Sequence, residues 1–395
     1  MSLTTRPSWV EINTRALEDN YRQLRSLAPA QAECMAIIKA NAYGHSLALC
    51  APAAVRAGAQ WLGVTSVEEA AETRGYCPTA HGNTRILAIG GVLPAHGVTV
   101  IENNLTPVIW TAQHIDELEA AAHVANLKPQ SFAVHLEIDT GMSRQGADLE
   151  AIPAILARFT PDSPLFIEAV MTHLYASDES NSVKSAGQLH KLHEALRIVT
   201  ATHATQLKYL SAGASAALLG NDAHPIVTLA EEFHLQPMFR LGLALYGVEP
   251  RITPPIDSAP HPHLEPALTW KTRVADLRTI PAGTEIGYNG TFTATEPMKL
   301  ALLPIGYADG LSRKLGNHFS LLVRGQRAPL VGRVSMDQVV LDVTEIPAVE
   351  FGDEVVILGK QGEETISAYD HADAAGTIPW EIFTSIAPRV ERIAI

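Results

Sequence analysis

Short apolar runs alternate with helix-like stretches through the first 241 residues of the chain. The apolar runs have the length of buried strands and end in polar or turn-forming residues. They lie at residues 34–38, 61–64, 85–89, 107–110, 133–138, 165–171, 207–210 and 238–241. Most gaps hold helical patterns, at residues 46–58, 67–74, 112–125, 149–159 and 183–202. Eight β units that mostly alternate with α units predict an α/β fold, a closed parallel (β/α)8 barrel of the TIM type.

The pattern changes after a proline-rich stretch between residues 249 and 267. Such a stretch is typical of a domain boundary. Beyond it, short alternating runs occur at residues 268–277, 299–303, 320–323, 338–343 and 354–358, separated by Gly and Pro turns. These runs predict a smaller, mainly β domain. The sequence therefore predicts a barrel domain over residues 1–255 and a mainly β C-terminal domain over residues 256–395. A strand at residues 9–12 and a helix with Leu17, Tyr21, Leu24 and Leu27 on one face are expected to precede the first barrel strand.

Composition excludes several classes of protein. The net charge is -13 without any basic cluster, which argues against partners such as nucleic acid or anionic membranes. No stretch approaches the length of about 20 apolar residues that a membrane span needs, and residues 1–9 lack a signal-peptide core. The three cysteines, Cys34, Cys50 and Cys77, have no metal-ligand spacing and fit reduced thiols in a cytoplasmic protein. His261 and His263 lie among the prolines and are expected to belong to a linker rather than to a metal site.

Polar residues follow several of the predicted barrel strands. Lys39 ends the first strand, and a lysine at the mouth of an apolar site can become a nucleophilic amine because desolvation lowers its pKa. The alternative is a lysine that simply extends into water. The C-terminal ends of other strands carry Asp139, Arg144, His173, Ser211, Gly213, Ser215, Arg240 and Gly242. A parallel barrel gathers such ends at one mouth, so these groups are expected to form one site, with backbone amides available to an anion such as phosphate.

Seven sequence blocks resemble those of the alanine racemases, and the resemblance covers nearly the whole chain. The first is Lys-Ala-Asn-Ala-Tyr-Gly-His at residues 39–45, and the second is Asp-Thr-Gly-Met-Ser-Arg at 139–144. The others lie at residues 172–173, 240–247, 287–288, 304–310 and 331–338. Seven blocks in one order are far more specific than any single block.

The resemblance implies a pyridoxal 5'-phosphate enzyme that interconverts L-alanine and D-alanine and supplies D-alanine for peptidoglycan in the cell wall. It implies that Lys39 binds the cofactor as a Schiff base and then exchanges the substrate's α-proton on one face, while Tyr288 serves the opposite face. Two bases suit the chemistry, because inversion through a planar carbanion requires proton transfer on both faces. The cofactor delocalises that carbanion.

The resemblance also gives roles to further residues. Arg240 would face the pyridine nitrogen, which stays unprotonated because arginine does not give up its proton, and His173 would link Arg240 to Tyr288. The phosphate would be bound by Tyr43, Ser215, Trp380 and the amides of Gly242 and Leu243. Arg144 and the Met336 backbone would meet the substrate carboxylate, and Asp337 would be a further substrate-binding residue. The residues of the second domain would reach the site of a partner subunit, which implies a homodimer with shared active sites.

Three positions depart from the pattern of the family. Glu137 stands where many relatives have a carbamylated lysine, Trp380 stands where a phosphate-binding tyrosine is common, and Ser46 replaces a glycine. Alternation along the strand predicts that Glu137 faces the barrel interior, where Arg144 is its expected partner. Trp380 would either donate its indole N–H near the phosphate or fill an apolar contact.

Other readings of the sequence stay open at this point. A barrel-type pyridoxal-phosphate decarboxylase would need a carboxylate at the pyridine nitrogen, which Arg240 argues against. A non-catalytic cofactor-binding barrel would lack the second domain and Tyr288, and a Schiff-base aldolase would not need phosphate-binding groups. A racemase of another small amino acid, such as serine, is a further alternative, because the sequence does not give side-chain selectivity.

Overall fold

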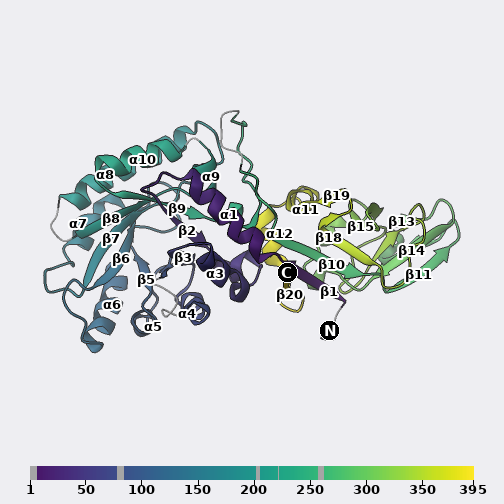
Figure 1. Ribbon diagram of the computed structural model, residues 1–395, viewed down its shortest axis with the longest axis horizontal. Coiled ribbons are helices and arrows are strands. Elements are labelled where there is room, and N and C mark those ends of the chain that lie inside the picture. Colours follow the sequence, from purple (N-terminus) through teal and green to yellow (C-terminus); the bar gives the residue numbers. More distant parts are fainter. Residues whose placement is uncertain (1–6, 78–83, 202–204, 221, 257–261) are drawn as a thin grey trace. The chain divides into compact units, whose positions relative to one another are not determined.

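The computed structural model describes residues 7–77, 84–201, 205–220, 222–256 and 262–395. Within these ranges the chain forms two compact units, one built on a closed barrel and one mainly of β-strands (Figure 1). Thr202, Pro260 and His261, which belong to the predicted last helix and linker, lie outside the described residues. No helix among the described residues is long and apolar enough to cross a membrane.

Within the described ranges, eight parallel strands pair in chain order to form the barrel, and the last pairs with the first. They are β2 (Glu33–Ile37), β3 (Trp61–Val64), β4 (Arg85–Ala88), β5 (Thr106–Ile109), β6 (Phe132–Glu137), β7 (Leu165–Met171), β8 (Thr205–Ser211) and β9 (Gln236–Leu241). The predicted fold class is confirmed. The strands could be recognised because helices cover their outer faces, so that each strand is a nearly continuous apolar run.

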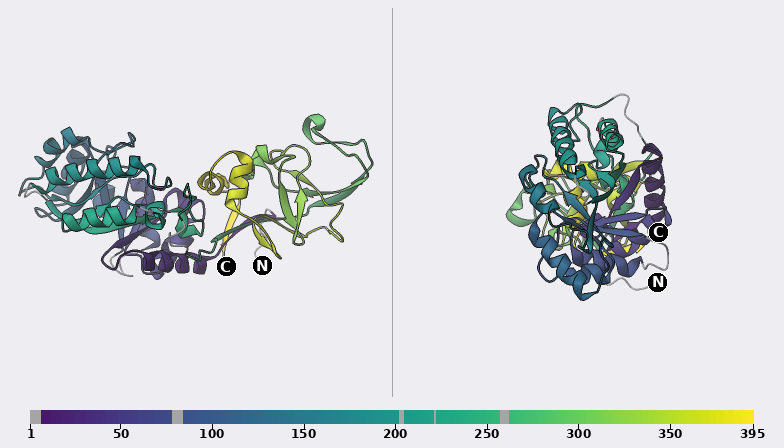
Figure 2. Two further views of the ribbon diagram at one scale, coloured as in Figure 1. Left: turned by 90° about the horizontal axis from the view of Figure 1, so that it is seen from above. Right: turned by 90° about the vertical axis from the view of Figure 1, so that its left-hand side faces the viewer.

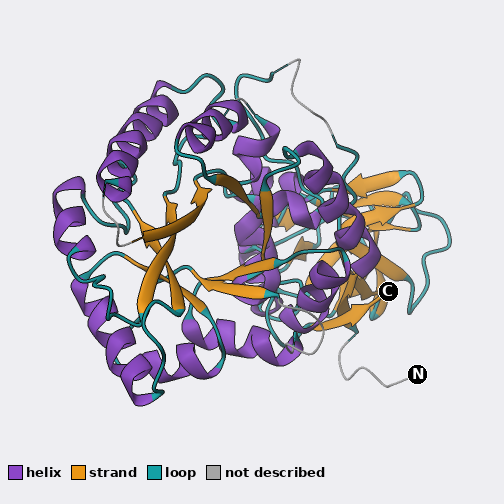
Figure 3. Cartoon of the chain, turned by 60° about the vertical axis from the view of Figure 1, so that its left-hand side comes forward, coloured by secondary structure: helices purple, strands orange, loops and turns teal. Residues whose placement is uncertain are grey.

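Helices form a ring around these strands (Figure 3). They are α1 (Thr14–Leu27), α3 (Leu47–Arg56), α4 (Val67–Tyr76), α5 (Gly97–Glu102), α6 (Ala112–Val124), α7 (Ile152–Leu156), α8 (Val183–Thr200), α9 (Ser215–Leu219) and α10 (Ala223–Glu232). In α1 the residues Leu17, Tyr21 and Leu24 are buried along one face, as their spacing predicts, whereas Leu27 at the end of the helix is exposed, contrary to the prediction. The hydroxyl of Tyr21 donates to the carbonyl of Cys34, 2.9 Å away, which ties this helix to the first barrel strand.

Among the described residues, the strands of the mainly β unit pair into three sheets. Figure 2 shows the ribbon of the chain from two further directions. The largest sheet has the order β16 (Gln326–Pro329), β15 (Ser320–Val323), β18 (Glu354–Gln361), β10 (Leu268–Arg273), β1 (Ser8–Ile12) and β20 (Glu391–Ala394), with β19 (Glu364–Ile366) beside β18. The second joins β11 (Asp276–Ile280), β14 (Met298–Leu303) and β17 (Val339–Asp342), and the third is the pair β12 (Glu285–Ile286) and β13 (Phe292–Thr293). Helices α11 (Ala368–Ala375) and α12 (Pro379–Ser385) complete the unit.

The N-terminal strand belongs to the mainly β unit. Strand β1 pairs antiparallel with β10 and parallel with β20, and Val10 and Ile12 are fully buried. The residues through Thr14 therefore group with Tyr43–Leu49 and Pro266–Ile395, whereas the predicted boundaries placed residues 1–255 together in the barrel domain. Where the chain leaves the barrel near residue 255 stays a prediction, because residues 257–261 lie outside the described ranges.

Candidate active site

Lys39 follows strand β2 at the C-terminal end of the barrel strands. The backbone then turns left-handed, and residues 40–43 all have φ of 53–54°. This conformation is unfavourable for residues with a side chain, at about 1–2 kcal/mol each. Two amides of the turn find acceptors, since Asn41 donates to the Glu69 carboxylate at 2.9 Å and Ala42 donates to the Ile38 carbonyl at 2.8 Å. The sequence does not indicate this turn.

The surroundings of Lys39 favour a neutral amine. Burial lowers its pKa most, and the positive charges of Arg144 and Arg240 lower it further, while Glu69 acts in the opposite direction. A lowered pKa increases the fraction of unprotonated amine at neutral pH. The barrel end therefore provides the electrostatic setting that a nucleophilic lysine requires.

Arg240 is buried beside Lys39's strand and makes several hydrogen bonds. Its Nη1 donates to the carbonyl of Ser211 at 2.8 Å and to the hydroxyl of the same residue at 2.7 Å. Its Nη2 donates to the carbonyl of Thr172 at 2.8 Å and to His173 Nδ1 at 3.1 Å. Burial lowers the pKa of Arg240 to about 10, so the guanidinium stays charged near neutral pH. These four hydrogen bonds fix the plane and the direction of the Arg240 guanidinium.

The contact with Arg240 also defines the tautomer of His173. A guanidinium only donates, so Nδ1 of His173 accepts and the proton of the neutral ring lies on Nε2. Burial, followed by the charges of Arg240, Arg144 and Lys39, lowers the pKa of His173 to about 3. His173 is therefore a neutral group that offers one N–H donor.

Donors suited to an anion lie after strands β8 and β9. Ser215 is the first residue of helix α9. Its hydroxyl oxygen accepts a hydrogen bond from the backbone N–H of Gly242 at 2.9 Å, so the hydroxyl proton can be donated to another acceptor. Gly242 precedes the short 3₁₀ helix Leu243–Tyr246, whose first amides have no partner within the helix. A side chain at Gly213 would lie 2.7 Å from the ring of Phe239, so only glycine permits this approach of the two strand ends.

Glu137 is buried inside the barrel, as the alternation of strand β6 predicts, but its predicted pairing with Arg144 is wrong. Its carboxylate accepts a hydrogen bond of 2.6 Å from the side-chain amide of Gln145, which also donates to the Ile89 carbonyl at 3.1 Å. Burial raises the pKa of Glu137, while Gln145, Arg240 and Arg144 act in the opposite direction. Arg144 itself is exposed, so its guanidinium is available to a ligand.

The remaining predicted site residues belong to the mainly β unit. Tyr288 and Met336 are 67% and 55% exposed, and the carboxylate of Asp337 is bound by Arg389 at 2.8 Å. Trp380 is partly buried in helix α12. The barrel unit thus gathers Lys39, Arg144, His173, Ser215, Arg240, Gly242 and Leu243, whereas Tyr43, Tyr288, Met336, Asp337 and Trp380 lie in the other unit. Sequence reasoning missed Gln145 and Arg389, although Gln145 directly follows one of the family-like blocks.

Both halves of the chain match models of one protein family. The match to "Alanine racemase, N-terminal domain" covers residues 12–250, and the match to "Alanine racemase, C-terminal domain" covers residues 267–394. The chain belongs to the alanine racemase family. This confirms the resemblance and the predicted class of activity, a pyridoxal-phosphate-dependent isomerase, and it rules out the decarboxylase and aldolase readings.

Individual relatives agree over the whole length. Alanine racemases of Carboxydothermus hydrogenoformans and Halothermothrix orenii are 37% and 36% identical over 395 and 391 residues, covering 99% and 98% of this chain and 100% and 97% of theirs. The structure of alanine racemase from Streptomyces coelicolor superposes with a TM-score of 0.88 at 30% identity, covering 99% of both chains. That of Bartonella henselae alanine racemase, solved with covalently bound pyridoxal phosphate, gives 0.82 at 28% identity and covers 98% of this chain and 99% of its own.

The residues of the barrel end fit pyridoxal phosphate. The cofactor needs an amine that can be unprotonated, a fixed group at its ring nitrogen, and hydroxyl or amide donors for its phosphate. Lys39 supplies the amine and the hydrogen-bonded Arg240 supplies the fixed group. The donors are the Ser215 hydroxyl and the Leu243 amide, because the Gly242 N–H already donates to Ser215. All of them follow barrel strands at the C-terminal end, where barrel enzymes carry their active sites.

Proposed function

We propose that this alanine racemase exchanges the α-proton of alanine with two bases, Lys39 on one face and Tyr288 on the other. Bound pyridoxal phosphate supplies the electron withdrawal that acidifies the substrate's α-carbon. The observation that carries the proposal is the lowered pKa of Lys39 at the barrel end, beside the row formed by Arg240 and His173. A single base would tend to return the proton to the face from which it came, so inversion needs Tyr288 as well.

Arg240 and His173 would determine which groups of this site carry protons. The charged Arg240 would lie against the ring nitrogen and, with a pKa of about 10, would not hand its proton to it near neutral pH. With its ring nitrogen unprotonated, the bound cofactor would be a weaker electron acceptor, which would disfavour the side reaction of protonation at the wrong carbon. His173, with its proton on Nε2, would donate to the Tyr288 oxygen and favour the form of Tyr288 that accepts a proton.

The phosphate and the substrate carboxylate would be held by separate sets of residues. The Ser215 hydroxyl and the Leu243 amide would bind the phosphate, together with Tyr43 and Trp380, and the Gly242 amide would join them only by leaving the Ser215 hydroxyl. The exposed Arg144 and the Met336 backbone N–H would bind the carboxylate, and Asp337 would contact the substrate beside them. Bidentate binding by a guanidinium suits a carboxylate, because the two planar groups match.

We further propose a cytoplasmic homodimer with shared sites, which supplies D-alanine for peptidoglycan. The exposure of Tyr288 and Met336 supports a partner, because a phenol that takes up protons from a carbon needs surroundings that exclude water. Cys34, Cys50 and Cys77 are all buried free thiols, which supports a reducing compartment.

Exchange of the α-proton in deuterium oxide tests the two bases. Tyr288→Phe is expected to lose racemisation while it keeps the near-visible absorption of the bound cofactor, and exchange should survive mainly from the enantiomer that faces Lys39. Lys39→Ala is expected to lose this absorption and racemisation together. Equal loss of exchange from both enantiomers in Tyr288→Phe would refute the two-base assignment.

Mixed dimers test the shared sites. When the two inactive variants are co-expressed, a dimer with one subunit of each kind combines the intact Lys39 of one chain with the intact Tyr288 of the other. Random pairing should then restore about a quarter of the wild-type activity. If each chain supplied both bases to its own site, the mixture would stay inactive.

A further inference from the structure

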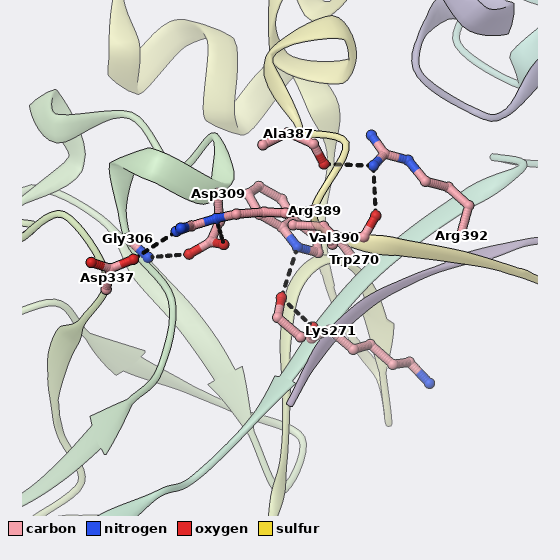
Figure 4. Close-up of polar contacts among 10 residues, drawn as sticks. Trp270, Lys271, Gly306, Asp309, Asp337, Ala387, Arg389, Val390 and Arg392 are labelled. Carbon is pink, nitrogen blue, oxygen red and sulfur yellow. Dashed lines mark hydrogen bonds and ion pairs between the residues drawn. The ribbon is translucent and has the colours of Figure 1, made fainter. Parts of the chain in front are cut away.

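Arg389 connects a buried aspartate to the exposed segment that carries Met336 and Asp337 (Figure 4). Its Nε donates to Asp309 Oδ1 at 2.7 Å, and its Nη2 donates to Asp337 Oδ1 at 2.8 Å. The side chain of Asp309 is fully buried, whereas that of Asp337 is 51% exposed. One guanidinium therefore spans from the interior of the unit to its surface.

The inner end of this connection is rigid. The second carboxylate oxygen of Asp309 accepts the backbone N–H of Gly306 at 3.0 Å, and its carbonyl accepts the N–H of Ala387, also at 3.0 Å. A buried carboxylate is stable only when its oxygens are hydrogen-bonded in this way. Arg392 fixes the segment from which Arg389 extends, since its Nη1 donates to the carbonyls of Ala387 and Val390, both at 2.6 Å (Figure 4).

The outer end is a segment whose backbone is also tightly packed. Tyr307 and Ala308 donate their N–H groups to the carbonyls of Ser335 and Met336, both at 3.0 Å. A side chain at Gly306 would collide with these two carbonyl oxygens, so the close approach of the segments requires glycine there. The backbone holds Met336, but Asp337 is held through its side chain by Arg389.

Folding alone does not account for the outer contact. An exposed ion pair contributes little to stability, and Asp309 already balances the charge of Arg389 inside the unit. Asp337, however, brings a negative charge next to the position assigned to the substrate's carboxylate. Unless it is neutralised and turned toward a cation, that charge would repel the substrate.

We propose that Arg389 is a positioning residue for substrate binding, which orients Asp337 and neutralises its charge so that the Met336–Asp337 segment can receive the amino-acid carboxylate. The inference rests on the proposed function, in which these two residues meet the substrate. Arg389 itself touches neither substrate nor cofactor in this assignment. It acts through Asp337, with Asp309 as its fixed support.

A double-mutant cycle on the cofactor-loaded enzyme tests this inference. Arg389→Met, Asp337→Asn and the double variant are compared for KM and kcat with L-alanine, thermal midpoint and cofactor absorption. Arg389→Met is expected to raise KM about tenfold with little change in kcat, because Asp337 loses this cation and its charge then repels the substrate carboxylate. Adding Arg389→Met to Asp337→Asn should change KM less than about twofold, because the repelling charge is already gone. Arg389→Lys, which keeps the charge, should be intermediate.

Arg327→Met is the matched control. Arg327 donates to the Glu364 carboxylate at 2.8 Å in an exposed ion pair of the same unit, and it has no role in the proposed site. This variant is expected to keep the wild-type KM and kcat. Its thermal midpoint measures what the loss of an exposed ion pair contributes by itself.

The outcomes separate the inference from the proposed function. If Asp337→Asn raises KM but Arg389→Met does not, or lowers only the thermal midpoint, the positioning role is refuted and the assigned substrate contacts stand. If the two effects on KM multiply in the double variant, Arg389 does not act through Asp337 and the inference fails. If Asp337→Asn leaves KM unchanged while Arg389→Met raises it, the assignment of Asp337 as a substrate contact fails but Arg389 still acts by neutralising its charge. If both variants keep the wild-type KM, the inference fails.

Discussion

Replacement of His173 by glutamine is expected to make the protein less sensitive to acid. In the native state the pKa of His173 is about 3, because burial and the neighbouring charges of Arg240, Arg144 and Lys39 disfavour its protonated form. In the unfolded chain the imidazole has its ordinary pKa of about 6.5. Below that value the unfolded state binds a proton that the native state does not, so stability is lost as the pH falls from 6.5 toward 3. Between pH 7 and pH 4 this group alone removes about 3 kcal/mol, at about 1.4 kcal/mol per pH unit.

Glutamine at this position cannot titrate, yet its side-chain oxygen can still accept from Arg240. The free energy of unfolding would be measured by urea titration at pH 7 and pH 4, with equal protein concentrations and excess cofactor. The quantity of interest is how much less stability His173→Gln loses than the wild type between the two pH values. All other titrating groups are common to both proteins and largely cancel in this difference.

His371 provides a matched control in the mainly β unit. It is 2% exposed, its Nε2 lies 2.7 Å from the Ile357 carbonyl, and burial lowers its pKa to about 4. Between pH 7 and pH 4, His371→Gln should therefore also lose about 3 kcal/mol less unfolding free energy than the wild type. Its racemisation activity should be unchanged. His173→Gln should lose activity as well, because it removes the Nε2–H donor. If wild type and His173→Gln lost the same stability between pH 7 and pH 4, His173 would not be the desolvated acceptor of Arg240 described above.

Three further substitutions test single residues of the site. Arg240→Glu should raise transamination relative to racemisation, measured as pyruvate formed per turnover, because a carboxyl group would protonate the ring nitrogen; an unchanged ratio would place Arg240 elsewhere. Glu137→Gln should raise KM for alanine about five- to tenfold through loss of a charge near Arg144, and the wild type should keep full activity when carbon dioxide is stripped from the buffer. Trp380→Phe should weaken cofactor binding severalfold if the indole N–H donates to the phosphate, by the loss of one hydrogen bond; unchanged affinity would mean that Trp380 only fills space.

The barrel could be predicted because its signal is local. Each parallel strand is buried on both faces, so strands such as Trp61–Val64 and Leu165–Met171 appear in the sequence as apolar runs with sharp ends. The rule that active groups lie at the C-terminal ends then singles out Lys39, His173 and Arg240 without any knowledge of contacts. The same reasoning placed Glu137 inside the barrel.

The position of the N-terminal strand could not be predicted in this way. Strand β1 has the short alternating pattern of many strands, and nothing in residues 8–12 indicates that Trp9 will pair with Lys271 rather than with a nearby segment. Pairing across such a separation depends on the whole sheet. The left-handed turn after Lys39 could not be predicted either. It is stabilised by contacts such as the hydrogen bond from the backbone N–H of Asn41 to the Glu69 carboxylate, and not by glycines that the sequence would show.

The partners of charged side chains are hardest to predict, because free energy and geometry choose them together. The sequence indicates that buried Glu137 needs a donor, and charge favours Arg144. Pairing with Arg144 would take a second charge out of water, whereas the amide of Gln145 is cheaper to bury and meets a second acceptor at Ile89. Arg144 thereby stays exposed, which a residue that binds a substrate carboxylate requires. For Glu137 the partner was a near neighbour in the sequence, whereas the partners of Arg389 are distant. Asp309 and Asp337 lie 80 and 52 residues away from Arg389, and only the fold brings both to its guanidinium.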